Sequence, residues 1–291
     1  MPLPNSFLDS AIYIYPSEDA VNSGLNVGAS GFIVCTEDEA GNTNAYYVVT
    51  NAHVIEGITR NAGQEVALRI NKHDGLVEIV TTRTDEWKLH PAGDDVAVCK
   101  VSPTHEWKFT HFSESVFLKP EYLHDQISLD TPPKAVIPIS KTDDEEKWQE
   151  VHKIGVGDDV VVIGRYAQHP GRDRNIPAVR FGHISMVPVD PVEQSDRNGF
   201  MQESILVECQ SISGLSGSPV ISQTRLDHLE KTLTSSSTRY DQMVLLVGVD
   251  WGHFDLKGEV AEIPSSTVRV PSGMMCVVPA WKISEILAIA N

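Results

Sequence analysis

Three short segments carry residue types that together can activate a serine. His53 follows the apolar run AYYVV, Asp95 opens the alternating run DVAVCKV, and Ser216 lies in the small-residue segment SISGLSGSPV. A serine hydroxyl is a poor nucleophile at neutral pH unless a neighbouring base removes its proton, and a histidine titrates in the useful range. A carboxylate fixes the histidine tautomer and stabilises the imidazolium. The three residues therefore predict a triad for acyl transfer, in the chain order His, Asp, Ser.

Each of the three residues has an ordinary structural explanation when taken alone. A lone histidine is usually a satisfied core or surface residue, and an aspartate before a strand usually serves a turn. Asp94 also competes with Asp95 for any functional role. An ordinary Gly-Ser loop requires no catalytic role. Small residues on both sides of the serine nevertheless let the backbone N–H groups of Gly214 and Ser216 point at one spot, as an oxyanion site requires. One good candidate for each role favours the catalytic interpretation.

Short runs rich in β-branched residues recur between turn residues along most of the chain, which is typical of an all-β protein. Helical periodicity is scarce, and its best example is the C-terminal segment 279–290, where one helical face can collect apolar residues. The expected strands cover residues 31–35, 45–50, 65–70, 77–83, 95–101, 159–165, 205–210, 219–222 and 243–249, and the expected helical face holds Trp281, Ile283, Ile286, Leu287 and Ile289.

The composition limits the classes of partner. The formal net charge is -17, from 23 basic and 40 acidic residues. A surface this acidic repels phosphate backbones, so we expect no nucleic-acid partner. The sequence has no apolar run long enough for a membrane span and no secretory leader pattern, so we expect no membrane association and a cytoplasmic protein.

The four cysteines are widely spaced, and each lies in an apolar run that resembles a strand. This spacing does not fit a CxxC redox or zinc motif, and we expect free thiols in the core, in agreement with a reducing compartment. None of the 11 histidines falls in a metal-ligand motif such as HExxH. We therefore expect neither a metal site nor a cofactor. The cysteines are Cys35, Cys99, Cys209 and Cys276.

Two polar segments interrupt the β-rich pattern, at residues 102–150 and 222–242. The first is rich in prolines and charges, and we expect it to connect two β-rich halves. The second is expected to be an excursion between strands. Long polar loops are where activity is commonly gated, so the involvement of an activating partner stays open.

Several blocks, in the same order along the chain, resemble trypsin-like (chymotrypsin-fold) serine peptidases, especially the bacterial high-temperature-requirement type but without a PDZ domain. The resemblance implies an all-β fold of two packed six-stranded β-barrels (chymotrypsin-like) with a C-terminal helix. Residues 1–115 would form the first barrel, 116–150 the connection and 151–291 the second barrel. The resemblance also assigns the role of triad aspartate to Asp95 and not to Asp94. The matching blocks are residues 28–34, 50–54, 95–98, 155–164, 180–185 and 214–219.

This resemblance implies a serine endopeptidase that hydrolyses protein or peptide substrates through an acyl-enzyme. His53 and Asp95 would come from the first barrel and Ser216 from the second, with the N–H groups of Gly214 and Ser216 as the oxyanion hole. Leu215 departs from the secreted digestive members, which carry at this place an aspartate that pairs with a freed N-terminus. Activation through that ion pair is not expected here.

Residues that would bind the substrate are also implied by the resemblance. Gln210 would lie near the floor of the pocket for the side chain before the cut, and it lacks the carboxylate that selects lysine or arginine. Asp250, Trp251 and Gly252 resemble the stretch that pairs with the substrate backbone as an added strand. A plain turn after a core strand explains them equally well. If the match holds, Asp250 supplies negative charge that favours basic residues.

Two other functions compete with the peptidase hypothesis. A catalytically silent peptidase fold that only binds peptides would be free to lose a triad member, and this sequence retains all three. An esterase would carry its GxSxG elbow between a parallel strand and a helix, with the histidine after the serine. Here His53 precedes Ser216 and the surroundings are β-rich, so the esterase is disfavoured.

Overall fold

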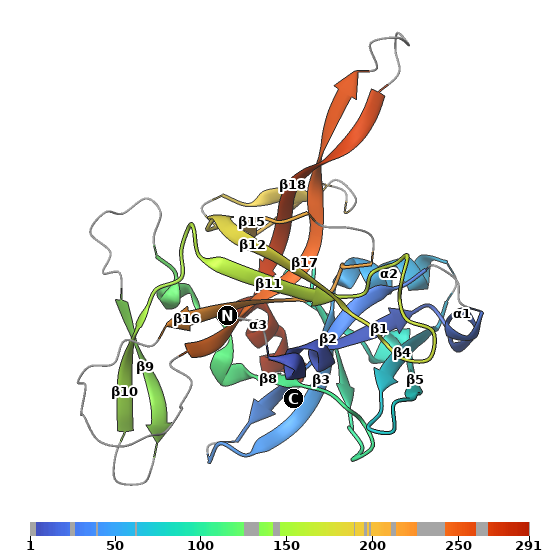
Figure 1. The fold of residues 1–291 in the computed structure, drawn as a ribbon, viewed down its shortest axis with the longest axis horizontal. Coiled ribbons are helices and arrows are strands. Elements are labelled where there is room, and N and C mark those ends of the chain that lie inside the picture. The colour runs from blue at the N-terminus through green and yellow to red at the C-terminus, as the bar shows by residue number, and fades with distance from the viewer. Residues whose placement is uncertain are drawn as a thin grey trace.

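The computed structural model describes residues 4–23, 27–38, 40–61, 63–124, 134–141, 146–188, 190–194, 197, 199–210, 214–225, 242–259 and 267–290. The chain is mostly β, as predicted, with two large sheets and a few short helices (Figure 1). None of the helices in these ranges is long and apolar enough to cross a membrane.

The N-terminal half forms one eight-stranded sheet. Its strand order is β5-β4-β1-β2-β3-β7-β6, and β8 pairs in parallel with β2. The end strands β5 and β6 do not pair within the described chain, so the sheet is a curled half-barrel and not the closed six-stranded barrel that we expected. The strands are β1 (Ala11–Tyr15), β2 (Ala29–Glu37), β3 (Thr43–Thr50), β4 (Glu65–Asn71), β5 (Val77–Arg83), β6 (Lys88–Leu89), β7 (Ala97–Val101) and β8 (His111–Ser113).

The C-terminal half forms a closed barrel of six antiparallel strands, in the order β11-β12-β15-β18-β17-β16, which confirms the predicted barrel. Two of its strands, β17 and β18, are much longer than the others and project beyond the barrel as a hairpin (Figure 1). The strands are β11 (Asp159–Gly164), β12 (Ala178–Met186), β15 (Ile205–Glu208), β16 (Pro219–Arg225), β17 (Gln242–Glu259) and β18 (Thr267–Pro279).

Smaller elements lie between and beside the two sheets. The expected connection contains a hairpin of β9 (Lys134–Lys141) and β10 (Glu146–His152), while residues 125–133 and 142–145 lie outside the described residues. Most of the expected excursion at 222–242 also lies outside them. A second hairpin joins β13 (Val192–Gln194) to β14 (Phe200–Gln202). The helices are α1 (Glu18–Asn22), α2 (Ala52–Arg60) and α3 (Trp281–Ala290), with 3-10 turns at Asn5–Ser10, Thr84–Glu86, Glu114–Val116 and Pro120–Tyr122.

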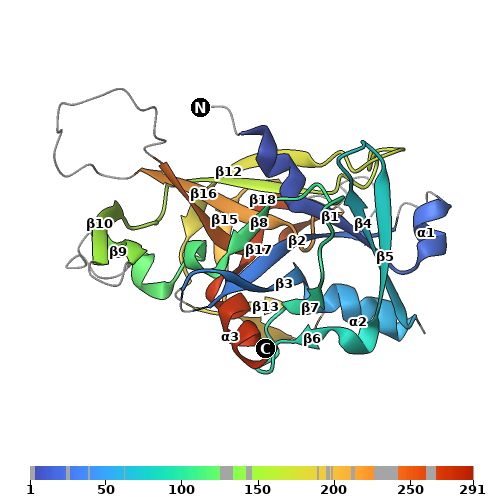
Figure 2. The same cartoon turned by 90° about the horizontal axis from the view of Figure 1, so that it is seen from below.

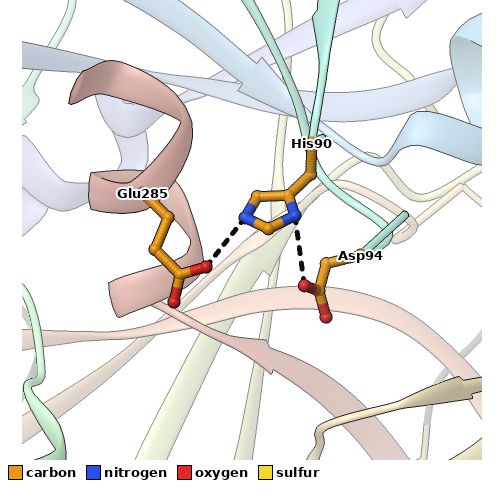
Figure 3. A group of neighbouring side chains, drawn as sticks. All are labelled: His90, Asp94 and Glu285. Carbon is orange, nitrogen blue, oxygen red and sulfur yellow. Dashed lines mark hydrogen bonds and ion pairs between the residues drawn. The ribbon is translucent and has the colours of Figure 1, made fainter. Parts of the chain in front are cut away.

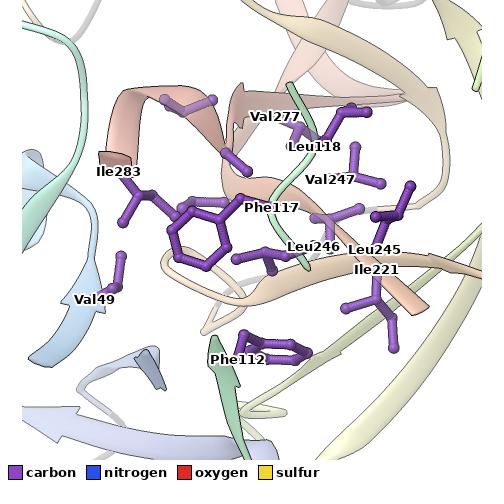
Figure 4. Packing of buried hydrophobic residues seen from close by; sticks show 14 of the residues in the cluster. Val49, Phe112, Phe117, Leu118, Ile221, Leu245, Leu246, Val247, Val277 and Ile283 are labelled. Atoms are coloured by element: carbon purple, nitrogen blue, oxygen red, sulfur yellow. The ribbon is translucent and has the colours of Figure 1, made fainter. Parts of the chain in front are cut away.

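A single apolar cluster joins the two halves. It collects Val49 from the first sheet, Phe117 from the segment between the sheets, Leu246 from the barrel and Ile283 from α3 (Figure 4). All four side chains are almost fully buried. Sliding one half past the other would expose this surface to water, at a cost of roughly 25 cal/mol per Å². The shared core therefore fixes the relative position of residues carried by the two halves.

Helix α3 closes the fold and packs against β6 and β7, beside which it lies in Figure 2. Its residues Ile283, Ile286 and Leu287 are buried, as predicted. Ile289 was expected on the same face but is 63% exposed. At about 100° per residue, Ile289 falls far around the helix from Ile283, so the predicted stripe was too wide.

Candidate active site

His53 and Asp95 form a close pair at the end of β3. His53 is the second residue of α2, a helix that the sequence did not predict. Its Nδ1 lies 2.7 Å from Oδ2 of Asp95, and its backbone N–H donates to Oδ1 of the same carboxylate at 2.9 Å. Asn51, which precedes the helix, donates from Nδ2 to the Asp95 carbonyl oxygen at 3.0 Å. These contacts direct the Nδ1 proton toward Asp95 and leave Nε2 available as a base.

Neighbouring contacts distinguish Asp95 from Asp94. The Asp95 side chain is only 1% exposed, and its backbone N–H donates to Oε1 of Gln202 at 2.7 Å. Nε2 of the same glutamine donates to Oδ1 of Asp94 at 2.7 Å. Asp94 faces His90, with Oδ2 3.1 Å from Nδ1 of that ring. The two carboxylates therefore serve different histidines, and Asp95 is the one that orients His53.

The electrostatic surroundings raise the pKa of His53. Burial alone would lower this pKa, but the hydrogen bond from the ring to Asp95 and the negative charge of that carboxylate act in the opposite direction. Arg197 lowers the pKa and Asp250 raises it, and the net value lies above the usual 6.5. The raised pKa favours the charged imidazolium form of His53.

Ser216 lies at the tip of a tight turn that is held against the first sheet. Ser218 N–H donates to the Leu215 carbonyl oxygen at 2.8 Å, which closes the turn, and the Leu215 side chain is fully buried. The backbone N–H of Ser30, on β2, donates to the Ser216 carbonyl oxygen at 2.8 Å. Oγ of Ser30 donates to the Gly214 carbonyl oxygen at 2.7 Å. The turn that carries Ser216 is therefore anchored to a strand of the other half.

His53, Gly214 and Ser216 line one cavity of about 370 Å³, with Tyr15 and Gly28 on its other walls. The structure thus brings the predicted base and nucleophile to the same hollow. No hydrogen bond joins Ser216 Oγ to His53 within the described chain. The Gly214 N–H belongs to the peptide bond with Ser213, which lies outside the described residues, so the oxyanion role of Gly214 and Ser216 stays a prediction. A larger cavity of about 620 Å³, also lined by α2, contains none of the predicted catalytic residues.

None of the four residues expected to bind substrate lines the cavity that contains His53 and Ser216. Gln210 is exposed beyond the end of β15 and Asp250 is fully buried, and the substrate-binding roles of both stay predictions. Trp251 donates from Nε1 to Oγ of Ser204 at 3.0 Å, and Gly252 N–H donates to Oδ1 of Asp250 at 3.0 Å. These three residues belong to β17, so the plain-turn alternative does not apply.

The four cysteines are free and buried, as predicted. Burial raises the pKa of every one of their thiols, to about 12 for Cys99 and for Cys276. Thiols with such a high pKa stay protonated at neutral pH and are poor nucleophiles.

A second group of titratable side chains lies beside the Asp95 loop, where His90, Asp94 and Glu285 approach one another (Figure 3). The His90 ring lies between the two carboxylates, with Nδ1 3.1 Å from Asp94 and Nε2 3.1 Å from Glu285. Lys282 brings its ammonium group within 3.4 Å of Asp94 and 3.3 Å of Glu285. Because the ring points its two nitrogens at different carboxylates and a lysine already supplies the cation, the group is an ion-pair network between α3 and the Asp95 loop.

Sequence reasoning missed the residues that hold the site together. Ser30 lies within a matching block, but nothing in its local sequence indicated that it would bind the Ser216 loop. Gln202 lies in a short strand far along the chain from Asp95, and no motif marks it. Thr50 is the last residue of β3 and donates from Oγ1 to the Ser30 carbonyl oxygen at 2.8 Å. All three act through contacts between segments that are distant in sequence.

A closed barrel beside a curled half-barrel, with a histidine that pairs with an aspartate and lines the same cavity as a serine, is the arrangement of chymotrypsin-like peptidases. The family model of the trypsin-like peptidase domain matches residues 29–225, a range that includes His53, Asp95 and Ser216, and the chain belongs to this family.

Three solved structures illustrate the range of similar proteins. The MamO protease domain of Magnetospirillum magneticum has a TM-score of 0.49 and 17% identity, with 97% of each chain covered. The active form of the Rv3671c protease of M. tuberculosis has a TM-score of 0.41 and 15% identity, covering 97% of this chain and 81% of that one. An inactivated protease paralogue of the scabies mite has a TM-score of 0.42 and 10% identity, covering 97% and 91%. A search of curated protein sequences finds no match.

Proposed function

We propose that this trypsin-like peptidase is a serine endopeptidase and that His53, Asp95 and Ser216 are its catalytic triad. The observation that carries the proposal is that His53, whose Nδ1 lies 2.7 Å from Asp95, lines the same cavity as Ser216. A carboxylate-oriented imidazole next to a serine in a small-residue turn is what activation of a hydroxyl requires.

The proposed reaction is acyl transfer in two halves. His53 removes the Ser216 proton as Oγ attacks a peptide carbonyl, and the same proton then passes to the leaving amine. Asp95 holds the ring in the required tautomer and stabilises its charged form. Backbone N–H groups of Gly214 and Ser216 receive the developing oxyanion, an interaction worth about 3 kcal/mol per donor. Water, activated by His53, then releases the acyl group from Ser216.

A peptide-binding module without catalysis is the second candidate. One observation favours it, namely that Ser216 Oγ and His53 share no hydrogen bond in the described chain. Catalytic hydrogen bonds are often long in the absence of substrate and shorten in its presence, so this geometry does not outweigh the complete set of residues.

Cleavage of an unfolded protein tests the endopeptidase directly. The purified chain is incubated with casein, and the new termini are identified by mass spectrometry. We expect internal cuts with wild-type protein and none with Ser216→Ala or His53→Ala. Cuts that persist in either variant, or a wild type that leaves casein intact, would contradict the proposal. Binding of casein-derived peptides without any cuts would favour the binding module.

A further inference from the structure

Arg197 reaches from the C-terminal half of the chain to the segments that carry His53 and Asp95. It lies between β13 and β14. Its Nη1 donates to the Gly93 carbonyl oxygen at 2.6 Å, and its Nη2 donates to Oε1 of Glu56 at 2.9 Å. Gly93 is two residues before Asp95, and Glu56 is three residues after His53 on α2. The guanidinium therefore ties the Asp95 loop to the helix that carries the histidine.

The same guanidinium is an ion-pair partner of Asp95. Nη1 lies 3.9 Å from Oδ1 of that carboxylate, which is an ion-pair distance and too long for a hydrogen bond. The Asp95 side chain is 1% exposed and that of Arg197 13%, so salt and water screen the pair weakly. Among the described residues, only His53 and Arg197 form ion pairs with Asp95. Because a buried carboxylate is costly without a partner, Arg197 supplies the positive charge while the imidazole is neutral.

Packing of the β13–β14 hairpin fixes the position of Arg197. Its guanidinium carbon lies 5.6 Å from the centroid of the Phe200 ring, and the same ring packs so closely on Gly93 that an added Cβ would overlap it. Gln202, further along β14, binds the Asp95 N–H. An arginine presents its donors in a rigid planar fork and stacks on aromatic rings, so it can hold several partners at once. The hairpin thus delivers two polar side chains to the Asp95 loop together.

Carboxylates outnumber cations around the His53–Asp95 pair. In the described chain one arginine faces three carboxylates, and Asp94 beside them is paired within the ion-pair network on α3. Without the arginine, the remaining negative charges would raise the pKa of His53 further, and less neutral base would be present near pH 7. The four groups are Arg197, Asp95, Asp250 on β17 and Glu56 on α2.

We propose that Arg197 is a positioning residue of the catalytic centre, which holds the Asp95 loop against α2 and balances the negative charge beside His53. It acts through Asp95 and not on the substrate, because it lines the separate cavity of about 620 Å³ and not the cavity that contains Ser216. The inference rests on the proposed function and deepens it, because it names the residue that keeps His53 able to act as a base near neutral pH.

The test titrates His53 in the full-length chain with Ser216→Ala, so that it does not depend on turnover. The histidine ring signals are followed by NMR from about pH 5 to pH 9, and the His53 signal is assigned by its loss in His53→Gln. The added variants are Arg197→Gln, Arg197→Lys and Arg83→Gln. Arg83 is the matched control because it also forms an ion pair, with Asp85, but its side chain is 67% exposed at the end of β5.

We expect Arg197→Gln to raise the pKa of His53 by about one unit, because the positive charge that favoured the neutral ring is gone. Arg197→Lys retains the charge and should keep the pKa of His53 near that of the Ser216→Ala chain, and Arg83→Gln should leave it unchanged. The inference is overturned if Arg197→Gln leaves the pKa where it was, if Arg83→Gln raises it equally, or if Arg197→Lys raises it by a full unit.

Labelling of chains that retain Ser216 by a fluorophosphonate probe gives a second measurement. Arg197→Gln should label about tenfold more slowly than wild type near pH 7, and the deficit should shrink near pH 9, where the ring is neutral in both. A deficit of the same size at both pH values would contradict the charge balance. Arg197→Lys cannot span all the partners of the guanidinium and should label severalfold more slowly. If Arg197→Gln does not fold, labelling of Arg197→Lys at the wild-type rate overturns the inference.

Failure of the proposed function would look different. A wild type that takes up no probe would refute the activated serine. A raised pKa of His53 in Arg197→Gln, measured by NMR in the same study, would still support the action of Arg197 on the histidine.

Discussion

Replacing Gly217 with alanine should displace the turn that carries Ser216. Gly217 has a φ of 86°, a left-handed conformation that an L-residue adopts at a cost of about 1–2 kcal/mol. The added Cβ would also overlap the Ser30 carbonyl oxygen and Thr50 Oγ1, which belong to the first sheet. Neither atom can retreat cheaply, because they are joined to each other by a 2.8 Å hydrogen bond.

The size of the effect follows from these two terms. Overlap with fixed core atoms costs roughly 1–3 kcal/mol, so the total loss of unfolding free energy is about 2–5 kcal/mol if the turn stays in place. If the turn moves instead, Ser216 shifts relative to His53, and a displacement of about 1 Å costs on the order of 100-fold in rate. Because the overlapped atoms belong to the first sheet, we expect the turn to move and the reaction of Ser216 to slow.

The assay is the rate of Ser216 modification by a fluorophosphonate probe, measured together with thermal unfolding. Gly75→Ala is a close control, because Gly75 has a φ of 87° and no atom within 4 Å of the added Cβ. It carries the same backbone strain without the overlap. We expect Gly75→Ala to label at the wild-type rate with a modest loss of stability, and Gly217→Ala to label about 100-fold more slowly. Equal labelling rates in the two variants would refute the reasoning.

Three further predictions concern the base, its support and the core. Because the pKa of His53 is raised, its neutral form is lost as the pH falls through a value above 6.5. The labelling rate should therefore begin to decline above pH 6.5, and a decline that begins only below pH 6.5 would contradict the contacts with Asp95. Gln202→Leu removes the hydrogen-bond partner of the Asp95 N–H and of Asp94 Oδ1, so it should lower the free energy of unfolding by about 1–3 kcal/mol and slow labelling. A denaturant unfolding curve that matches the wild type would contradict the role of Gln202 in holding Asp95. Phe117→Ala should cost about 3–5 kcal/mol, because its ring is 1% exposed in the shared core, and a loss below 1 kcal/mol in the same melts would contradict that packing.

Local sequence patterns predicted the elements that depend on local physics. Short runs rich in β-branched and other apolar residues marked strands such as β3 and β7, in which consecutive residues on both faces are buried. The two short segments around His53 and Asp95 lie at the ends of those strands, and β3 pairs with β7 so that Thr50 lies opposite Ala97. The pairing of these strands is what brings the histidine and the carboxylate together.

The remaining features depend on contacts between distant segments. The first sheet has eight strands and an open side between β5 and β6, and no local pattern reveals pairings such as that of β2 with β8. The hydrogen bond from Ser30 to Gly214 spans 184 positions, and a lone serine gives no signal of it. The length of the β17–β18 hairpin was also missed, because Gly252 and Gly258 interrupt the strand pattern beyond the barrel. The helix that carries His53 was missed because it is short and follows directly on a strand.

The central claim is that Ser216 is a nucleophile activated by His53. Its most direct test is to treat the purified chain with a fluorophosphonate probe and to map the modified residue by mass spectrometry, with Ser216→Ala and His53→Ala as controls. We predict covalent modification at Ser216 that falls to background in both variants. An unmodified wild type, or modification that His53→Ala leaves unchanged, would contradict the account.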